Sequence, residues 1–416
     1  MTGFDKRRVV VTGLGSVSPL GNNARDTWQG MVEGRSGIAR ITLFDPSDFK
    51  TQIAAEVKGF NPRDYMDGKL ARRVDRFTQF AIAASREAVE DASLDLEHED
   101  IYRVGVLMGT GVGGIGTLLK QQGVLDKRGP RKVSPFLITA MTPDAASGQV
   151  AIDLGVRGPN YAVVSACATG SGTIGEAFEI IRRDDADVMI TGGTEAAILP
   201  ITIAGFNVVG GISTRNDEPE RASRPFDLNR DGFILGEGAA VLVLEELEHA
   251  LARGARIYAE VIGYGVSADA YHMIAPEPEG AGAIAAMKMA LRKAGIEPED
   301  VDYINAHGTS TPLNDKTETA AIKKVFGEHA YKLMVSSTKS VTGHMLGAAG
   351  AIEGLACVMA LYEGVVPPTM NYETPDPECD LDYVPNEARK APIKIALSNS
   401  FGLGGHDSTV VFRKWE

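Results

Sequence analysis

Cysteine is scarce in this sequence: Cys167, Cys357 and Cys379 are the only three among 416 residues. Three cysteines exclude a disulfide framework, because at least one of them must remain unpaired. Such scarcity is typical of proteins that work in a reducing compartment, so we expect a cytoplasmic protein. A thiol in an unusual setting therefore needs an explanation other than disulfide bonding.

The sequence also lacks a long apolar run and a net positive charge. No run reaches the ~18 residues that a membrane-spanning helix needs, and Met1–Arg8 has no apolar signal-peptide core. The formal net charge of −13 disfavours binding to nucleic acid. We expect no membrane span and no nucleic-acid partner, and an acidic partner protein would need a local basic patch.

Strand-like and helix-like segments alternate along the chain, which predicts an α/β protein with mostly parallel sheets covered by helices. A chain of this length usually forms two domains or two halves of one body. The 47 glycines indicate many tight turns and close backbone approaches. Residues 40–75 and 120–150 are polar, and we expect them to be irregular insertions in the first half.

An internal repeat relates the two halves of the sequence. A strand-like run, an alanine-rich helical pattern and a second strand-like run recur in the same order. The matching segments are Val9–Thr12 with Ala259–Ile262, Ala81–Leu94 with Ala283–Ile296, and Val104–Met108 with Val301–Ile304. Chance explains two similar alanine-rich helices more easily than three elements in matched order. We therefore expect two duplicated halves, residues 1–255 and 256–416.

Three reactive side chains stand among small residues that a hydrophobic core would not select. Cys167 lies in Ser-Ala-Cys-Ala-Thr-Gly-Ser-Gly, His307 in Asn-Ala-His-Gly-Thr-Ser and His344 in Thr-Gly-His-Met-Leu-Gly. Each follows a strand-like run and precedes a turn or a helix, and sites in α/β sheets form at that end of the strands. One thiol with two imidazoles indicates covalent catalysis through a thioester.

Cys167 is the best candidate nucleophile among the three thiols. It precedes a helical pattern over residues 168–183, and a helix N-terminus favours a thiolate. The alternative is an inert buried cysteine. That alternative suits Cys357 in the apolar pattern Ala351–Leu361, while Cys379 lies in an acidic, proline-rich stretch.

Two charged residues near His344 can control its orientation: Lys339 before it, and Glu353 in the helix that follows. A zinc site is the alternative use of one cysteine and two histidines. These residues lack the short ligand spacing of zinc sites, and no further ligand completes the set. We expect no metal.

Glycine-rich turns imitate a dinucleotide site. Gly109–Gly114 fits the G-x-G-x-x-G pattern after a strand. An NAD-dependent oxidoreductase is an alternative function that rests on these glycine-rich turns alone. No acidic residue follows at the expected offset, so tight turns at the sheet edge are the better interpretation. Near the C-terminus, the turn Gly402–Gly405 could present backbone N–H groups to an oxyanion.

Together these motifs resemble the β-ketoacyl-[acyl-carrier-protein] synthases of the thiolase superfamily, over nearly the whole chain. The chain looks most like the elongating type II synthases of fatty-acid biosynthesis. The motifs that carry the resemblance are Ala166–Gly170, Asn305–Thr311, Lys339–His344, Gly347–Gly350, Asn399–Gly402 and Ser267–Met273.

The resemblance implies a five-layer αβαβα thiolase fold from two duplicated halves, a homodimer and no cofactor. It implies that Cys167 takes an acyl chain from acyl-carrier protein as a thioester. Malonyl-acyl-carrier protein then loses CO2, and its carbanion attacks that thioester. The product is a 3-oxoacyl chain, two carbons longer, on the carrier protein.

The resemblance also implies roles for single residues. His307 and His344 would promote decarboxylation as hydrogen-bond donors, and Lys339 and Glu353 would orient His344. The backbone N–H groups that would form the oxyanion hole are those of Cys167 and Leu403. The implied substrate-binding residues are Thr309 and Thr311 on the pantetheine arm, together with Val112, Phe401 and Leu403.

The sequence departs from the family pattern in the C-terminal glycine turn. Where the family has phenylalanine, this chain has Leu403, and Asp407 stands where the family usually has asparagine. The family phenylalanine separates the acyl pocket from the malonyl side, so we expect Leu403 to gate less tightly.

A basic residue that related enzymes often carry near Gly210 is also missing. Docking of the carrier protein then falls to Lys69, Arg72 and Arg73, in the most basic short stretch of an acidic protein. The alternative for this stretch is an ordinary solvated run of charge.

Two related protein classes fit the sequence less well. A degradative thiolase has a second cysteine in its C-terminal glycine turn, and Gly402–Asp407 has none. A chain-length partner subunit of a polyketide complex lacks the active cysteine, whereas Cys167 is present. The preferred chain length, the choice between fatty-acid and polyketide pathways, and the identity of the carrier protein stay open.

Overall fold

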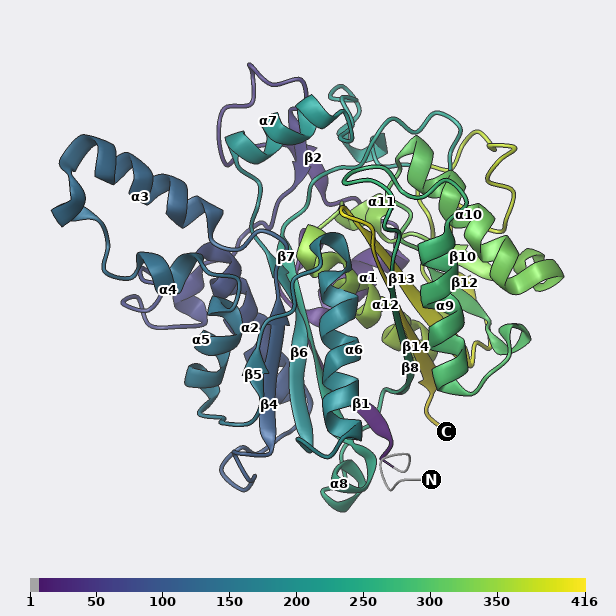
Figure 1. Cartoon of the computed structure of the whole chain (residues 1–416), viewed down its shortest axis with the longest axis horizontal. Coiled ribbons are helices and arrows are strands. Elements are labelled where there is room, and N and C mark those ends of the chain that lie inside the picture. Colours follow the sequence, from purple (N-terminus) through teal and green to yellow (C-terminus); the bar gives the residue numbers. More distant parts are fainter. Residues whose placement is uncertain (1–6) are drawn as a thin grey trace.

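The computed structural model describes residues 7–416 (Figure 1). Residues 1–6, on which part of the signal-peptide prediction falls, lie outside the described residues. Ten strands form one mixed sheet in the order β10-β9-β13-β14-β8-β1-β7-β6-β4-β5. They are β1 (Val9–Val17), β4 (Val104–Gly109), β5 (Asn160–Tyr161), β6 (Val188–Glu195), β7 (Gly238–Glu246), β8 (Ala259–Ala268), β9 (Tyr303–Asn305), β10 (Met334–Ser336), β13 (Ile395–Gly402) and β14 (His406–Lys414).

A narrow junction divides this sheet at its centre, where β1 and β8 pair antiparallel over three residues only. Outward from the junction, both halves have the same arrangement. Two antiparallel pairs, through β7 or β14, are followed by two parallel pairs that end at β5 or β10. The predicted duplication is confirmed in this topology. The prediction of mostly parallel pairing is wrong, because β7 and β14 run antiparallel to both of their neighbours.

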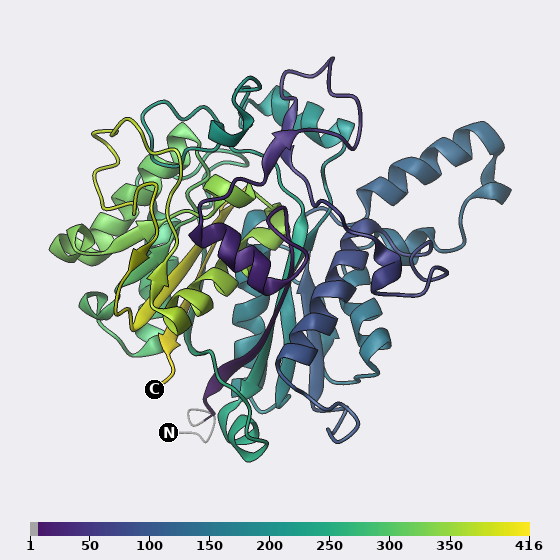
Figure 2. The ribbon, with the colours of Figure 1, turned by 180° about the vertical axis from the view of Figure 1, so that it is seen from behind.

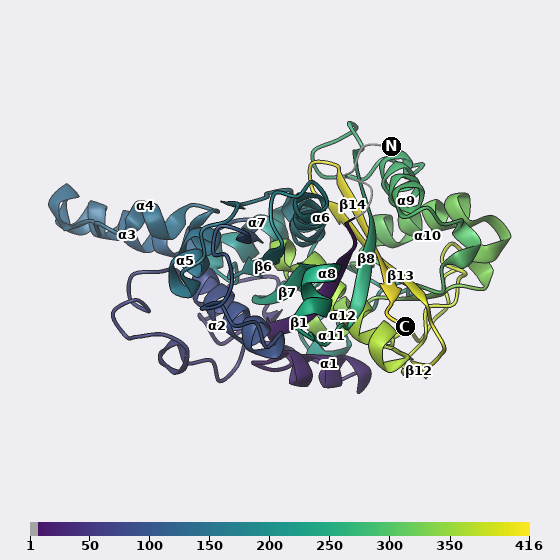
Figure 3. The same cartoon turned by 90° about the horizontal axis from the view of Figure 1, so that it is seen from below.

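Helices and half-sheets stack in five layers (Figure 3). One outer layer consists of α2 (Arg76–Asp91) and α5 (Ala145–Leu154), and the other of α9 (Ala281–Ala294) and α10 (Pro312–Phe326). Between the two half-sheets lie α6 (Thr169–Arg182) and α12 (Ala349–Glu363), which pack against each other. The αβαβα fold expected from the sequence is therefore confirmed.

The two central helices approach closely because their facing residues are small. A Cβ atom on Gly170 would lie 2.3 Å from the backbone N of Ala351.

The segment Leu346–Glu363 is long and apolar enough to cross a membrane, but 83% of it is buried inside the protein. The apolar helical pattern Ala351–Leu361 seen in the sequence corresponds to the greater part of this helix. Its apolar character fits the core between two half-sheets.

Shorter elements complete the described chain: α1 (Ala24–Val32), β2 (Ile38–Arg40), β3 (Ile53–Ala55), α3 (Ile115–Arg128), α4 (Leu137–Met141), α7 (Pro200–Val209), α8 (Leu247–Ala252), α11 (Lys339–Thr342), β11 (Val365–Val366) and β12 (Arg389–Lys390). The prediction that residues 120–150 are irregular is wrong, because α3, α4 and α5 cover most of them. Figures 1 and 2 show α3 and α4 as an arm that projects from the body, and no residue of α3 is buried. Because no residue of α3 packs into a core, the helix has no buried apolar face that would have marked it in the sequence.

Candidate active site

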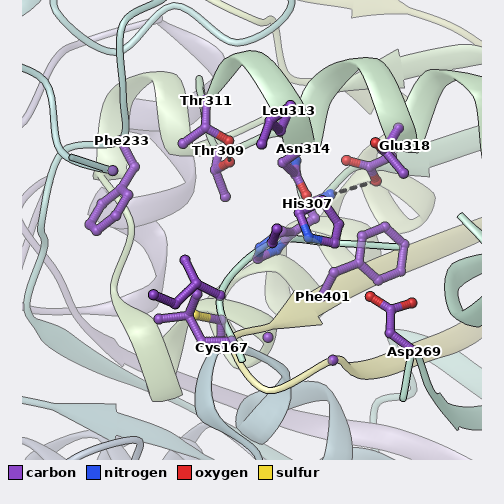
Figure 4. Close-up of a pocket in the computed structure, with 18 of the residues that line it drawn as sticks. Cys167, Phe233, Asp269, His307, Thr309, Thr311, Leu313, Asn314, Glu318 and Phe401 are labelled. Carbon is purple, nitrogen blue, oxygen red and sulfur yellow. Dashed lines mark hydrogen bonds between the residues drawn. The ribbon is translucent and has the colours of Figure 1, made fainter. Parts of the chain in front are cut away.

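The three reactive residues singled out in the sequence meet in one cavity of about 410 Å³ (Figure 4). Cys167 comes from the first half, and His307 and His344 come from the second. The two imidazole ring centroids lie 5.3 Å apart, and the Phe401 ring lies 5.7 Å from that of His307. All of these residues line the cavity, so strand ends of both halves contribute to a single site.

Cys167 is presented by a strained turn. Ala166 has a φ of +50°, and the 3-10 turn Ala166–Ala168 leads directly into α6. The Oγ1 atom of Thr169 accepts a hydrogen bond from the backbone N of Ser165 at 2.9 Å, which fixes the entry to the turn. Residues in left-handed conformations cost free energy and concentrate at functional sites. The small side chains around Cys167 permit this sharp change of direction.

The Cys167 side chain is a thiol in the resting cavity. Burial raises its pKa to about 11, and the buried Glu195 and Glu353 also raise it. A hydrogen bond from the backbone N–H of Leu403 and the charge of Lys339 act in the opposite direction but are weaker. The expectation of a resting thiolate is therefore wrong, because desolvation outweighs the influence of the helix N-terminus. The Leu403 N–H nevertheless points at the sulfur.

Both imidazoles are neutral at physiological pH. Burial lowers the pKa of His307 and that of His344 well below the ordinary value, and the charge of Lys339 lowers both further. Within residues 7–416, neither Nδ1 atom has a hydrogen-bond partner. A neutral imidazole still offers one N–H donor. The pair can therefore donate hydrogen bonds to a substrate oxygen without becoming charged.

Lys339 and Glu353 form a buried ion pair with each other. Burial raises the pKa of Glu353 to about 7, although Lys339 lowers it. Neither side chain makes a hydrogen bond to the His344 ring in the described part of the chain. Lys339 thus acts on the two histidines through its charge, and the expected contact with His344 is not made.

Thr309 and Thr311 lie at the cavity wall, where their hydroxyl groups are 2.9 Å apart. Leu403 also lines the cavity, with 41% of its surface exposed.

The structure does not bring Val112 to this cavity: its side chain is partly exposed elsewhere, and its N–H donates to Glu195.

The three basic residues expected to bind a carrier protein are exposed. Lys69, Arg72 and Arg73 lie on the loop before α2, and the Arg73 guanidinium lies 4.5 Å from the centre of the Phe136 ring. Arg72 and Arg73 line a second, open hollow that reaches α7. They therefore form a surface separate from the cavity lining.

Sequence reasoning missed two buried glutamates that organise the site. The Glu318 carboxylate accepts hydrogen bonds from the backbone N–H groups of His307 and Gly308, each at 2.8 Å. Glu195 accepts from the Thr110 hydroxyl at 2.8 Å and from the N–H of Gly347 at 3.0 Å. An acidic residue at the end of a strand, as at Glu195 in β6, was a signal that could have been noticed.

Two family models match the chain: the beta-ketoacyl synthase N-terminal domain over residues 6–250, and the beta-ketoacyl synthase C-terminal domain over residues 258–373. Together they cover most of its length. The chain belongs to the beta-ketoacyl synthase family. The family predicted from the sequence motifs is thereby confirmed, and the chain is a condensing enzyme of that family.

Curated members of the beta-ketoacyl synthase family match over the full length. A 3-oxoacyl-[acyl-carrier-protein] synthase 2 of Synechocystis sp. is 54% identical over 416 residues, covering all of both chains. The synthase of the same name from Coxiella burnetii is 56% identical and covers 99% of each chain. One from Staphylococcus aureus is 54% identical over 99% of each chain.

Solved ketosynthases share the fold. A type II polyketide ketosynthase, in complex with its acyl-carrier protein and bound to a hexaketide, superposes with a TM-score of 0.91 at 36% identity. That alignment covers 99% of this chain and 100% of the other. A beta-ketoacyl synthase from Burkholderia phymatum gives the same TM-score at 35% identity and the same coverage.

Proposed function

We propose that this beta-ketoacyl synthase elongates acyl chains in fatty-acid biosynthesis by decarboxylative condensation. The observation that carries the proposal is the cavity in which a thiol, two neutral imidazoles and an inward-pointing backbone N–H converge. Relatives above 50% identity are named as synthases of this kind, whereas the polyketide ketosynthase matches at 36%. The substrates are acyl and malonyl thioesters of an acyl-carrier protein.

The first step is transfer of the acyl group to Cys167. The sulfur attacks the thioester carbonyl, and the N–H groups of Cys167 and Leu403 stabilise the oxygen of the tetrahedral intermediate. Collapse breaks the bond to the pantetheine sulfur, which leaves with the thiol proton. Because the resting group is a thiol, proton removal has to accompany the attack.

The second step joins two carbon atoms. The malonyl carboxylate leaves as CO2, and its bonding electrons form an enolate whose oxygen accepts hydrogen bonds from His307 and His344. The enolate carbon attacks the acyl carbonyl, the bond to Cys167 breaks, and the released sulfur takes a proton from solvent. Neutral donors in a buried cavity suit this step, because they stabilise the enolate without donating a full proton.

Other cavity residues have supporting roles in the proposal. Thr309 and Thr311 contact the pantetheine arm, and Phe401 and Leu403 contact the acyl and malonyl groups. Lys339, paired with Glu353, sets the charge near the imidazoles. Val112 would contact the acyl chain only if that chain extends beyond the cavity described above.

Docking of the acidic carrier protein is assigned to Lys69, Arg72 and Arg73. They are exposed, and the rest of the protein carries excess negative charge. If these residues hold the carrier, affinity should fall with added salt, because exposed ion pairs are screened. Triple reversal to glutamate should raise KM for the carrier about tenfold and leave kcat unchanged. An unchanged KM would contradict the assignment.

A homodimer is part of the proposal. The strand β5 forms one end of the sheet. An edge strand presents backbone N–H and C=O groups that can form hydrogen bonds with a strand of a second chain. Exposed apolar side chains lie beside it and along the arm: Leu118, Leu119, Ile138, Tyr161 and Val164. Light scattering should give the mass of two chains, and a monomer mass would contradict this part.

We further propose a cytoplasmic location and a division of the two halves between residues 255 and 256.

The condensing function is tested by intact mass. Purified protein mixed with an acyl-carrier-protein thioester should gain the mass of the acyl group, and Cys167→Ala should gain none. Cys357→Ala is the matched control, since its thiol is buried away from the cavity, and it should still be acylated. Addition of malonyl-carrier protein should then release a 3-oxoacyl product two carbons longer. Failure of the folded protein to be acylated by any carrier thioester would overturn the proposal.

A polyketide role is the second candidate, because one of the solved relatives is a type II polyketide ketosynthase in complex with its acyl-carrier protein. The products distinguish the two roles. A fatty-acid synthase should stop after one condensation and should accept saturated acyl chains again only after reduction. Repeated condensation on an unreduced 3-oxoacyl product would favour the polyketide role.

A further inference from the structure

Two segments meet beside the oxyanion hole. The first is the turn Gly402–Gly405, called here the oxyanion turn, which carries the N–H of Leu403. The second is Asp269–Glu277, called here the strap, which follows β8 and lines the cavity through Ile274 and its neighbours. The position of the oxyanion turn against the strap decides where the Leu403 N–H points.

Backbone hydrogen bonds join the strap to the oxyanion turn at two places. The N–H of Asp269 donates to the carbonyl of Gly405 at 2.9 Å, and the N–H of Gly404 donates to the carbonyl of Met273 at 3.1 Å. The strap is braced internally as well, since an Asp269 carboxylate oxygen accepts from the N–H of Glu277 at 3.0 Å. These bonds extend the β8–β14 ladder, which ends at the pair of Ala268 with His406, so the strap and the oxyanion turn meet at the open end of a sheet pairing.

Two carboxyl groups face each other where these segments meet. A Cβ atom on Gly282 would lie 2.1 Å from Oδ2 of Asp407 and 2.5 Å from Oδ1 of Asp269, so both oxygens border the same small space. Asp407 is only 5% exposed, and its Oδ2 has no hydrogen-bond partner among the described residues. Both side chains line the cavity, and Figure 4 shows Asp269 directed towards it.

The surroundings supply no compensating positive charge. The described cavity lining contains no lysine or arginine, and its other acidic groups are Glu277 and Glu318. The N-terminus of α9 lies nearby, but the N–H of Ala281 already donates to the Glu277 carboxylate at 2.9 Å. His406, beside Asp407 on β14, is exposed and lies near Gly404. The strap residue His272 accepts two N–H bonds from its own loop.

We propose that Asp407 carries a proton at neutral pH and donates it in a hydrogen bond to Asp269, and that this bond positions the oxyanion turn. Asp407 and Asp269 are then positioning residues for acyl transfer, acting through the N–H of Leu403. The proposal rests on the proposed function. It concerns a residue that replaces the asparagine usual in the family pattern.

The direction of the pH effect follows from the burial of Asp407. Burial, with a smaller contribution from the charge of Asp269, raises the pKa of Asp407 to about 8. A raised carboxyl pKa means that the joined arrangement favours the protonated form. Its extra stability is present in full at acid pH, decreases as pH rises above the ordinary value for aspartate, and is lost once pH passes about 8. Above that pH, two like charges border one dry space and push strap and turn apart.

The test measures the rate at which a medium-chain acyl-pantetheine thioester acylates Cys167, at pH 7 and pH 9, by intact mass. Ionisation of Cys167 itself speeds the reaction at high pH, so each protein's pH 9 to pH 7 ratio is compared with that of Asp407→Asn. Asparagine has the same shape and stays uncharged. The wild-type ratio should be about tenfold lower than that of Asp407→Asn.

A second variant and a control keep the test sharp. Asp269→Asn removes the other member of the pair, so its ratio should match that of Asp407→Asn, and the double variant should add nothing further. His406→Gln changes the neighbouring side chain and should keep the wild-type ratio. Equal ratios in wild type and Asp407→Asn, or a ratio that moves with His406→Gln alone, would overturn the proposal.

An infrared measurement separates this proposal from the proposed function, because it needs no activity. Burial also raises the pKa of Glu318 and that of Glu353 to about 7, so the Asp407 band is read from the difference between the wild-type and Asp407→Asn spectra. That difference should show the carbonyl band of a protonated carboxyl group at pH 7, and the band should disappear by pH 9. Absence of the band from the difference spectrum of the folded proteins overturns the proposal. Failure of acylation at pH 7 in a protein that shows the band would instead overturn the proposed function.

Discussion

The turn before α6 and the turn before α12 occupy equivalent places in the two halves, and only one of them carries the nucleophile. Ala166 has a φ of +50° and Leu346 a φ of +45°, and each begins a 3-10 turn of three residues that leads into a central helix. The second residue of the first turn is Cys167. The second residue of the other turn is Gly347.

The backbone N–H groups of these two residues have different surroundings. The N–H of Gly347 donates to Glu195, the last residue of β6. At the equivalent place in the second half, β13 ends in Gly402, which has no side chain to fill the space near the N of Cys167. The same backbone arrangement thus gives two different N–H groups. The N–H of Gly347 is closed, since it already donates to a side chain, and the N–H of Cys167 is open, since no side chain of the neighbouring strand end occupies the space in front of it. The difference lies in which residue ends the neighbouring strand.

Removing the Glu195 carboxylate, which accepts the hydrogen bond from Gly347, should have the largest effect, and the effect is on stability. Glu195→Ala would leave the buried donors of Thr110, Gly111, Val112 and Gly347 without their acceptor. Each buried donor left without a partner costs about 1–3 kcal/mol of unfolding free energy, and the loss is measurable by urea denaturation. Glu195→Gln keeps one acceptor oxygen and should lose clearly less. A Glu195→Ala protein as stable as wild type would show that the carboxylate does not hold this half closed.

Closing the open half should slow acylation. Gly402→Ala would place a Cβ atom 2.8 Å from the carbonyl O of Ser165 and 3.1 Å from the N of Cys167, displacing the oxyanion hole. Loss of one oxyanion donor costs about 100-fold in rate, which single-turnover acylation measured by mass would detect. Gly205→Ala in α7, where a Cβ atom meets nothing within 4 Å, is the matched control. Acylation at the wild-type rate in Gly402→Ala would refute the interpretation of an open N–H.

Enlarging the side chain beside the open N–H should have the smallest effect. Leu403→Phe restores the bulk that the family pattern has at this position, so the cavity should discriminate more strongly between short and long acyl chains. We expect a severalfold change in the ratio of kcat/KM for two chain lengths, on the scale of one or two methylene groups in an apolar pocket. Leu313→Phe, at the cavity wall, is the control. Identical profiles in both variants would show that Leu403 is no gate.

The sequence predicted the duplicated halves and the meeting of Cys167, His307 and His344, because motifs of small residues after strands are local signals. It did not predict the neutral thiol, since desolvation depends on how completely the two halves enclose Cys167. The sequence analysis expected Lys339 and Glu353 to orient His344, and it did not predict that they pair with each other, because spacing along the chain does not reveal which neighbour a side chain meets.

Long-range contacts account for the other misses. Glu195 and Glu318 act on backbone groups that only the folded chain brings near them. Asp269 in the strap and Asp407 in β14 are far apart in sequence, and nothing in either local motif indicates that their carboxyl groups share one space. Helix α3 was taken for irregular chain, because its apolar residues have no core in this chain to give them a pattern.

The burial of α12 between the half-sheets also has a consequence for how the protein is made. A ribosome completes α6 before it begins β8, and α12 follows only after β10. Until then, the inner face of α6 lacks the helix against which it packs in the finished fold. The first half therefore emerges with an apolar surface exposed, a state that favours aggregation during synthesis. The helix that completes the core is also the one that ends this vulnerable period.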